Sequence, residues 1–216
     1  MSSTLRPGVL PVAVIVAAAI VATAVAPVPI AFGAGDVEAG RRKAGPCAAC
    51  HGADGNSTNP AVPSLAGQPT FYTHWQLVLF RDGRRRDPQM SPFGANLTDA
   101  DMADLAAYYA AQRPPRPSTA SDADTSTAGQ RLAQVHHCAS CHASELAGPR
   151  YTPHLAGQSY AYLVKQLREF KAGTRGELDG ATMTSAAQPL TEQEIEILAR
   201  FYANLPVAPA TPGGRP

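Results

Sequence analysis

The segment Cys47-Ala48-Ala49-Cys50-His51 organises this chain of 216 residues, because the same pattern occurs a second time. The second copy is Cys138-Ala139-Ser140-Cys141-His142, which begins 91 residues after the first. Together the two copies contain all 4 cysteines of the chain. Two thiols about one helical turn apart, followed at once by an imidazole, therefore form a repeated unit rather than a chance cluster.

This Cys-x-x-Cys-His pattern predicts covalent attachment of haem. Each pair of thiols can bond the two vinyl groups of one haem c, and the histidine that follows can bind the iron. Other interpretations fit less well, because a redox-active dithiol needs a βαβ context and a zinc site needs further ligands. A disulfide would leave the repeated histidine unexplained. We therefore expect two covalently bound haem c groups, attached through Cys47, Cys50 and His51 and through Cys138, Cys141 and His142.

A second motif also recurs and makes the chain a tandem repeat. Pro63-Ser64-Leu65-Ala66-Gly67-Gln68 returns 90 residues later as Pro153-His154-Leu155-Ala156-Gly157-Gln158, with His154 in the place of Ser64. Each proline follows a haem motif closely. We expect its carbonyl to accept a hydrogen bond from Nδ1 of the ligand histidine, although an ordinary turn proline is the alternative.

The sixth iron ligand is expected from methionine. Met90 and Met183 stand at matching positions of the two copies, in segments expected to be loops. Met102 aligns with Ile195, so we expect it in the core. Ligation of each iron by two histidines would need a shared histidine outside the haem motif, and none aligns. His51 with Met90, and His142 with Met183, are therefore the expected metal ligands, a set that raises the reduction potential and suits electron transfer.

The composition favours an all-α fold, because alanine is abundant and β-branched and aromatic residues are sparse. Gly83 and Gly173 are expected to end the middle helix of each copy. Thr98 and Thr191 are expected to begin the last helix as N-caps, each with an acidic residue three positions on. The other expected helices cover residues 36–49, 71–81, 128–139 and 160–171.

The repeat divides the chain into five parts. Each copy has about 80 residues, a size at which a hydrophobic core alone is marginal and a large buried cofactor would help. A stretch rich in Pro and Ser separates the copies and predicts an exposed linker. The expected parts are a signal peptide or N-terminal anchor (1–35), a first domain (36–113), a linker (114–127), a second domain (128–205) and a flexible tail (206–216).

The N-terminal part predicts export. An apolar run over residues 12–26 follows a short segment that carries Arg6, as in a secretory signal. Uncharged sequence continues to Phe32, so a retained membrane anchor is the alternative. Both interpretations place the remaining chain in the periplasm, and an uncleaved segment would associate with the membrane.

The charges are balanced, with 18 Lys and Arg against 17 Asp and Glu. This balance argues against a nucleic-acid partner, which would select a basic excess. Arg85 and Arg175 recur in a Gly-x-Arg pattern after the middle helix. They are expected either to face haem propionates or to be solvated surface charges.

The motifs CAACHGADG, PSLAGQ, QLxxFxxG and MSPFGANLTDADMADLAAYYA, with their counterparts in the second half, resemble the dihaem cytochrome c4 family over residues 36–205. The resemblance implies two tandem class I cytochrome c domains related by a pseudo-twofold axis. It implies His51 and Met90 on one iron and His142 and Met183 on the other. It also implies a carrier without an enzymatic reaction of its own, which takes electrons from a cytochrome bc complex towards a terminal oxidase.

Two other functions remain open from the sequence. The first is the electron-accepting subunit of an oxidoreductase complex, such as a flavocytochrome sulfide dehydrogenase, with a periplasmic dehydrogenase as partner. The second is a dihaem peroxidase, which would need an open sixth position at one iron.

Overall fold

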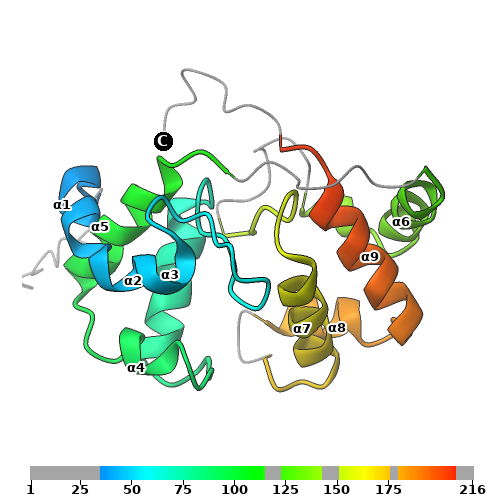
Figure 1. Cartoon of the computed structure of the whole chain (residues 1–216). Coiled ribbons are helices and arrows are strands. Elements are labelled where there is room, and N and C mark those ends of the chain that lie inside the picture. The colour runs from blue at the N-terminus through cyan, green and yellow to red at the C-terminus, as the bar shows by residue number, and fades with distance from the viewer. Residues whose placement is uncertain (1–34, 115–122, 143–150, 176–179, 208–216) are drawn as a thin grey trace, which may run out of the picture. The chain divides into compact units, whose positions relative to one another are not determined.

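The computed structural model describes residues 35–114, 123–142, 151–175 and 180–207, all within one compact unit of the chain. Every regular element in these ranges is a helix, which confirms the all-α prediction (Figure 1). The expected signal segment, the middle of the linker and most of the tail lie outside the described residues. Among the helices that are described, none combines the length and the apolar character needed to cross a membrane.

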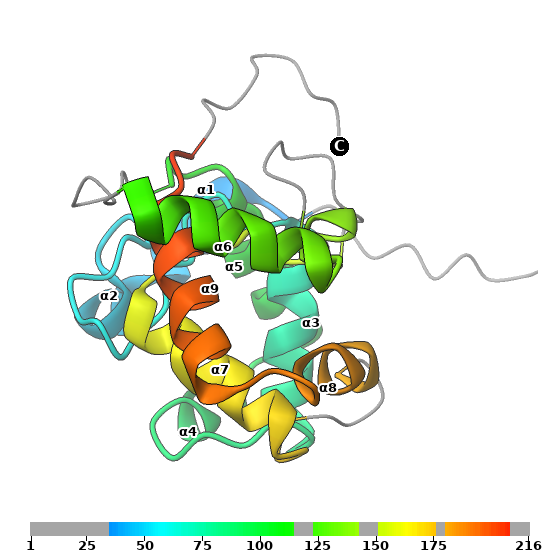
Figure 2. The ribbon, with the colours of Figure 1, turned by 90° about the vertical axis from the view of Figure 1, so that its right-hand side faces the viewer.

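The first copy of the repeat forms helices α1 to α5, and the second forms α6 to α9 with a short 3₁₀ helix, η1. The bounds in the first half are α1 Val37–Lys43, α2 Gly45–His51, α3 Thr70–Arg81, α4 Ser91–Gly94 and α5 Asp99–Ala110. Those in the second half are α6 Ala123–Val135, η1 Cys138–Ser140, α7 Tyr160–Lys171, α8 Ala181–Ala187 and α9 Glu192–Asn204. Figure 2 shows α6 and α7 lying beside α9, the last helix of its half.

Each half has a hydrophobic core of its own, built where the first and middle helices pack against the last one. Met102 and its counterpart Ile195 are both 0 % exposed, which confirms Met102 as a core residue. Burial of this kind stabilises by about 1.5–3 kcal/mol per large apolar side chain. The cores are completed by Leu77, Val78, Leu105 and Tyr109 in the first half and by Leu163, Val164, Leu198 and Tyr202 in the second.

The predicted helix ends are observed. Thr98 accepts a hydrogen bond from the Asp101 N–H at 3.1 Å, and the Asp101 carboxylate accepts from the Thr98 N–H at 3.0 Å. Thr191 and Glu194 form the same reciprocal pair at the start of α9. These capping boxes satisfy N–H groups that a helix start otherwise leaves without partners.

The glycine stops are also observed. Gly83 and Gly173 follow α3 and α7 with φ of 68° and 69°, a left-handed conformation that favours glycine. In the first half the Arg84 N–H then donates to the Leu79 carbonyl at 2.9 Å, which closes the end of α3.

The expected single helix over residues 36–49 is wrong, because the structure divides it into α1 and α2. The cause is Pro46, which lacks an N–H and cannot donate to the carbonyl of Arg42. The break reorients the chain just before the first haem motif.

The second half begins differently from the expectation of a helix over 128–139. Helix α6 starts at Ala123, inside the segment expected as linker, and ends at Val135. His137 then adopts a left-handed conformation with φ of 55°, so that Cys138 starts η1 rather than continuing α6. Histidine tolerates this conformation better than most residues, which gives α6 an end without glycine.

The first and last helices of each half cross so closely that only glycine fits. A Cβ on Gly40 of α1 would collide with the Asp104 carbonyl oxygen and lie 2.6 Å from the Tyr108 Cβ. In the second half a Cβ on Gly129 would collide with the Cβ of Phe201. Both halves therefore need glycine at this helix crossing because the two helices approach closely, and not because a turn requires a positive φ.

Replacement of Gly40 by Ala should lower the free energy of unfolding by about 1–3 kcal/mol, because α1 and α5 must move apart. Gly45→Ala is the matched control, since nothing lies within 4 Å of its added Cβ. The control should be neutral or stabilising by about 0.4–1 kcal/mol. Guanidinium unfolding followed by circular dichroism measures both, and equal stability of the two variants would contradict the packing argument.

Candidate functional site

The residues predicted to bind haem all line one cavity of about 1660 Å³, to which both halves contribute. That volume exceeds the range of about 300–1,000 Å³ typical of a site for one small ligand. The structure thus brings together residues that lie up to 136 positions apart in the sequence. They are Cys47, Cys50, His51, Met90, Cys138, Cys141, His142 and Met183.

His51 is the last residue of α2 and is only 8 % exposed. Its Nδ1 lies 2.8 Å from the carbonyl oxygen of Pro63. Because a carbonyl only accepts, Nδ1 must carry the proton, and Nε2 keeps a free lone pair. Burial lowers the pKa of His51, which also favours the neutral ring. The side chain is therefore held as a neutral imidazole with Nε2 available for a metal.

His142 repeats this arrangement in the second half. Its Nδ1 lies 2.9 Å from the carbonyl oxygen of Pro153, and burial again lowers its pKa. The contacts confirm the predicted role of both prolines as acceptors. Such a bond fixes the ring plane and the tautomer of a histidine ligand.

Neither cysteine pair forms a disulfide. Cys47 and Cys138 are partly buried, and burial raises the pKa of each thiol. Cys50 and Cys141 are exposed.

Three buried hydroxyls on the cavity wall have no hydrogen-bond partner among the residues that the structure describes. They belong to Thr73, Tyr109 and Tyr202. Burial also raises the pKa of both tyrosines, each of which neighbours the first cysteine of its own motif. An unsatisfied buried hydroxyl costs about 1–3 kcal/mol, so the cavity fits a bound group that carries polar atoms as well as a large apolar surface.

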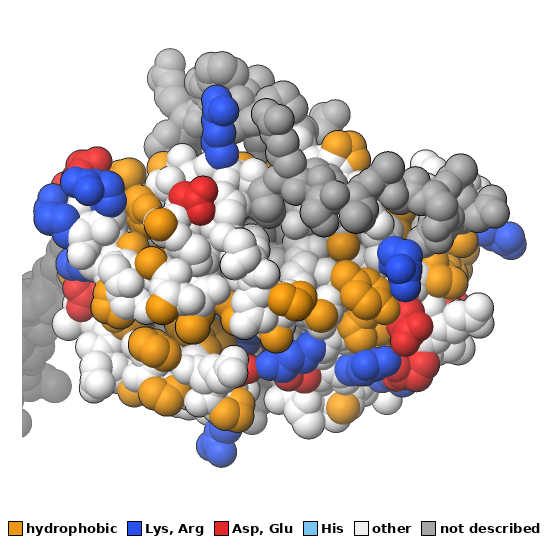
Figure 3. All heavy atoms as spheres, in the orientation of Figure 1, with side chains coloured by type: hydrophobic (Ala, Val, Ile, Leu, Met, Phe, Trp, Pro, Cys, Tyr) orange, Lys and Arg blue, Asp and Glu red, His pale blue; other side chains and the backbone are white. Residues whose placement is uncertain are grey.

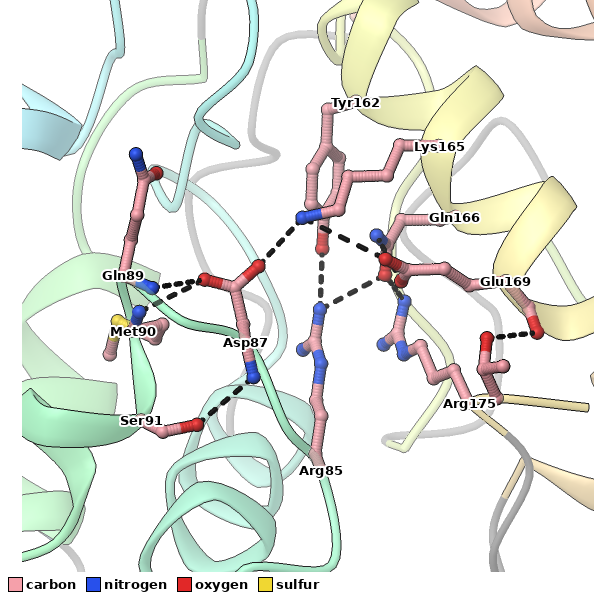
Figure 4. A network of polar contacts seen from close by, with 11 residues as sticks. Arg85, Asp87, Gln89, Met90, Ser91, Tyr162, Lys165, Gln166, Glu169 and Arg175 are labelled. Carbon is pink, nitrogen blue, oxygen red and sulfur yellow. Dashed lines mark hydrogen bonds and ion pairs between the residues drawn. The ribbon is translucent and has the colours of Figure 1, made fainter.

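Met90 is the N-cap of α4, and Asp87 positions it (Figure 4). One carboxylate oxygen of Asp87 accepts from the Met90 N–H at 3.0 Å and from the Gln89 N–H at 2.9 Å. The other accepts from Lys165 of the second half at 2.6 Å. Burial raises the pKa of Asp87, but the Lys165 ammonium and the two N–H groups outweigh it, so the pKa is lowered.

Met183 lies inside helix α8, whereas the sequence predicted a loop for it. The segment Ala181-Thr182-Met183-Thr184 follows Gly180 and is rich in small residues that allow one helical turn to form. The two methionines therefore reach the cavity from different local structures, and the prediction of equivalent loops is wrong.

Arg85 joins the two halves through a polar network (Figure 4). It donates to Gln76 of its own half at 2.6 Å. It also donates to Tyr162 and Gln166 of the other half, at 3.0 Å each. Its guanidinium lies 4.6 Å from the ring centroid of Phe80, close enough for a cation–π contact.

Arg175 makes the reciprocal set of contacts. It donates to Gln166 of its own half, and across the boundary to Gln76 at 3.0 Å and to Tyr72 at 3.4 Å. The expectation that these arginines are solvated surface charges is therefore wrong. Both also line the cavity, which leaves the propionate interpretation open.

The sequence did not reveal Asp87 or the glutamines as functional residues. Gln76 and Gln166 occupy matching positions of the repeat, but nothing in the sequence indicates their role. Their hydrogen bonds with the arginine of the other half join residues 99 and 81 positions apart, respectively. Asp87 precedes Gln89 by two residues, the spacing of an Asx turn, and this was the one local signal available.

Comparisons with known proteins agree with this geometry. The cytochrome c family model matches residues 37–111 and 126–206. Cytochrome c4 of Pseudomonas aeruginosa is 38% identical over 185 residues, which cover 82% of this chain and 92% of that protein. The crystal structure of reduced recombinant cytochrome c4 from Pseudomonas stutzeri superimposes with a TM-score of 0.73 at 34% identity, covering 80% of this chain and 100% of that one.

A relative with a different stated role is also similar. The "thiosulfate dehydrogenase electron acceptor" of Stutzerimonas stutzeri strain A1501 is 36% identical over 172 residues. The match covers 74% of this chain and 78% of that protein.

Replacement of Asp87 by Ala should accelerate hydrogen exchange at the Met90 amide several-fold, because the acceptor of that N–H is lost. Asp87→Asn keeps an acceptor oxygen but removes the charge that pairs with Lys165, so it should exchange almost as the unchanged protein does. Amide exchange measured by NMR compares the two, with Asp82→Ala as an exposed control. Equal acceleration in both variants would assign the effect to the ion pair instead.

Proposed function

The chain belongs to the cytochrome c4 family, and on that premise we propose that it carries electrons from a cytochrome bc complex towards a terminal oxidase. As a family member it binds two haem c groups and transfers electrons without an enzymatic reaction of its own. The observation that carries the proposal is the duplicated site. In each half a neutral histidine, buried in the first half and half-buried in the second, has its Nδ1 hydrogen-bonded to a proline carbonyl and shares the cavity with a methionine.

The proposed attachment points are Cys47 and Cys50 for the first haem, and Cys138 and Cys141 for the second. We assign the iron ligands as His51 with Met90 and His142 with Met183. When bound, the haem iron supplies a one-electron redox change. The chain holds each imidazole in one orientation, buries it and presents a thioether in the same cavity. A thioether ligand would raise the reduction potential of the bound haem, and methionine in that role would leave no site for peroxide.

Arg85 and Arg175 are proposed to neutralise haem carboxylates. Each guanidinium meets amide and phenol oxygens, and among the contacts of the described residues neither has a carboxylate as hydrogen-bond partner. A half-buried cation that no carboxylate hydrogen-bonds is costly. Both arginines line the cavity, so propionate groups would supply the missing negative charge.

We also propose the five-part division into residues 1–35, 36–113, 114–127, 128–205 and 206–216, with the first part directing export to the periplasm. The apolar run over residues 12–26 supports export, and its retention would tie the carrier to the membrane. Helix α6 begins at Ala123, so residues 123–127 of the proposed linker are helical and continue into the second domain.

The proposed partners are redox proteins that meet the exposed rim of the cavity. Phe93 on α4 and Tyr151 line it and are 51% and 65% exposed. On the face seen in Figure 3, hydrophobic side chains are exposed over both halves, whereas charged ones gather over α1 and over α7 and α9. An apolar contact surface with balanced total charge suits brief encounters between carriers.

Substitution of either proposed methionine ligand should lower the reduction potential of one haem only, because a thioether raises it. Met90→Ala should affect the first haem and Met183→Ala the second, and each should weaken the faint red absorption band that reports methionine ligation. Potentiometric titration of the full-length haem-loaded chain measures both. Met102→Leu, a change of similar volume inside the core, should leave both potentials unchanged. Unaltered potentials in both alanine variants would refute the ligand assignment.

A second candidate is the electron-accepting subunit of an oxidoreductase complex. The similarity to a thiosulfate dehydrogenase electron acceptor favours this role, with thiosulfate rather than sulfide as the substrate of the partner. The catalytic site would belong to the partner, and the dihaem chain would only receive its electrons.

The two roles predict different electron donors. As a respiratory carrier, the oxidised full-length chain should be reduced rapidly by membranes that contain an active cytochrome bc complex. It should be reduced slowly by a thiosulfate dehydrogenase supplied with thiosulfate, and it should not co-purify with an oxidoreductase at fixed stoichiometry. Stopped-flow absorbance gives both rates. Faster reduction by the dehydrogenase, together with a stoichiometric complex, would establish the second role.

A further inference from the structure

Two buried glutamines connect the halves at the level of the haem ligands. Gln68 and Gln158 end the repeated Leu-Ala-Gly-Gln motif, and each is 7% exposed. A buried amide needs partners for both its oxygen and its nitrogen. Each glutamine finds them on the backbone of the other half.

The contacts form two-point clamps. The Gln158 side chain accepts from the Ser64 N–H at 2.9 Å and donates to the Ser64 carbonyl at 2.9 Å. The Gln68 side chain accepts from the His154 N–H at 3.0 Å and donates to the His154 carbonyl at 2.8 Å. The two clamps are reciprocal, because each half supplies one glutamine and one clamped residue.

The clamped peptides are the ones that hold the histidines. The N–H of Ser64 and the carbonyl of Pro63 belong to a single planar peptide group. Gln158 binds the N–H of that group, and His51 donates to its carbonyl at 2.8 Å. The result is a chain of hydrogen bonds from the glutamine of one half, through one peptide, to the histidine of the other.

The second half has the same chain in the opposite direction. Gln68 binds the N–H of the peptide between Pro153 and His154, and His142 donates to its carbonyl at 2.9 Å. Consecutive hydrogen bonds through one peptide polarise each other, so the glutamine makes the proline carbonyl a stronger acceptor. A stronger acceptor makes the histidine a more basic ligand, which stabilises oxidised iron.

We propose that Gln158 is a positioning residue for His51 and that Gln68 is a positioning residue for His142, so that each half sets the reduction potential of the haem in the other. The inference rests on the proposed function, because it takes these histidines as iron ligands. It adds a role for the glutamines, whose hydrogen bonds among the described residues go to backbone groups and not to a proposed ligand or attachment cysteine.

The two clamps are not identical. The Gln158 oxygen is shared, since it also accepts from the Ser159 N–H at 2.9 Å. At the other clamp, His154 makes an additional contact across the boundary, from its Nδ1 to the Gly67 carbonyl at 3.0 Å. When Gln68 is removed, the hydrogen bond between His154 and Gly67 still holds this segment against the other half. The hydrogen bond that polarises the peptide between Pro153 and His154 is lost.

If the glutamines only held the two halves together, their removal would shift the reduction potentials in the opposite direction. Loosening the boundary would admit water to both haems, and water stabilises the charged, oxidised iron and lowers both potentials. Loss of polarisation at one proline carbonyl weakens one histidine as a donor and raises the potential of that haem alone. The direction of the shift in reduction potential, and whether one haem or both are affected, distinguish the two roles.

The experiment uses the full-length haem-loaded chain with Gln158→Met and Gln68→Met. Methionine approximates the length of glutamine and removes both hydrogen bonds to the other half. At Gln158 it also removes the bond from the Ser159 N–H. The matched control is Gln193→Met on the exposed surface of α9. Potentiometric titration gives both potentials, assigned to the haems through Met90→Ala and Met183→Ala.

We expect a crossed pattern. Gln158→Met should raise the potential of the first haem and Gln68→Met that of the second, in each case beyond the shift in the control. The Nδ1–H of the affected histidine should also exchange with solvent several-fold faster, as measured by NMR. A shift in the haem of the same half, a fall in both potentials, or no shift beyond the control would overturn the inference.

Failure of this inference differs from failure of the proposed function. If the unchanged protein has two haems with methionine ligation and the glutamine variants give no crossed shift, only the positioning role is lost. If the unchanged protein lacks methionine ligation, as judged by the faint red band, the proposed function itself is wrong.

Discussion

Both sites depend on one interaction, the hydrogen bond from a buried histidine Nδ1 to a proline carbonyl. Without it a buried imidazole could exist as either tautomer, and Nε2 would not be reserved for a metal. Gly67 and Gly157 adopt left-handed turns that reverse the chain after each proline. Their N–H groups donate to the backbone carbonyls of Tyr109 and Tyr202, near the end of the last helix of each half. The core of each half therefore holds the acceptor in place.

Much of this arrangement could be predicted because the signals are local or repeated. Capping boxes, glycine stops and the spacing of the haem motif act within a few residues, and duplication doubled each of them. The break at Pro46 also has a local cause, the missing N–H of proline, although one helix was expected over residues 36–49. The helical setting of Met183 had no such signal, because small residues such as Ala and Thr are compatible with either a loop or a helical turn.

Contacts between the halves could not be predicted, for a physical reason. The glutamine clamps join residues 86 and 94 positions apart, and the partner in each case is backbone, which has no sequence signature. The same limit applies to Lys165, which pairs with Asp87 although the corresponding residue of the first half is Trp75. The two proposed ligand sets therefore lie in unlike surroundings, and differences in hydrogen bonding and exposure would give the two haems different potentials.

The polar character of the boundary between the halves follows from their covalent connection. Separate proteins must gain enough from apolar burial to offset the loss of translational freedom, but two domains on one chain have a high effective concentration. The contacts between the halves then need not supply much binding free energy, and polar groups with defined geometry are sufficient. Amide, phenol and guanidinium groups impose distances and angles that apolar contacts do not, and they transmit polarisation through peptide groups. A boundary of this kind keeps two redox centres in a fixed relation and lets each half alter the chemistry of the other.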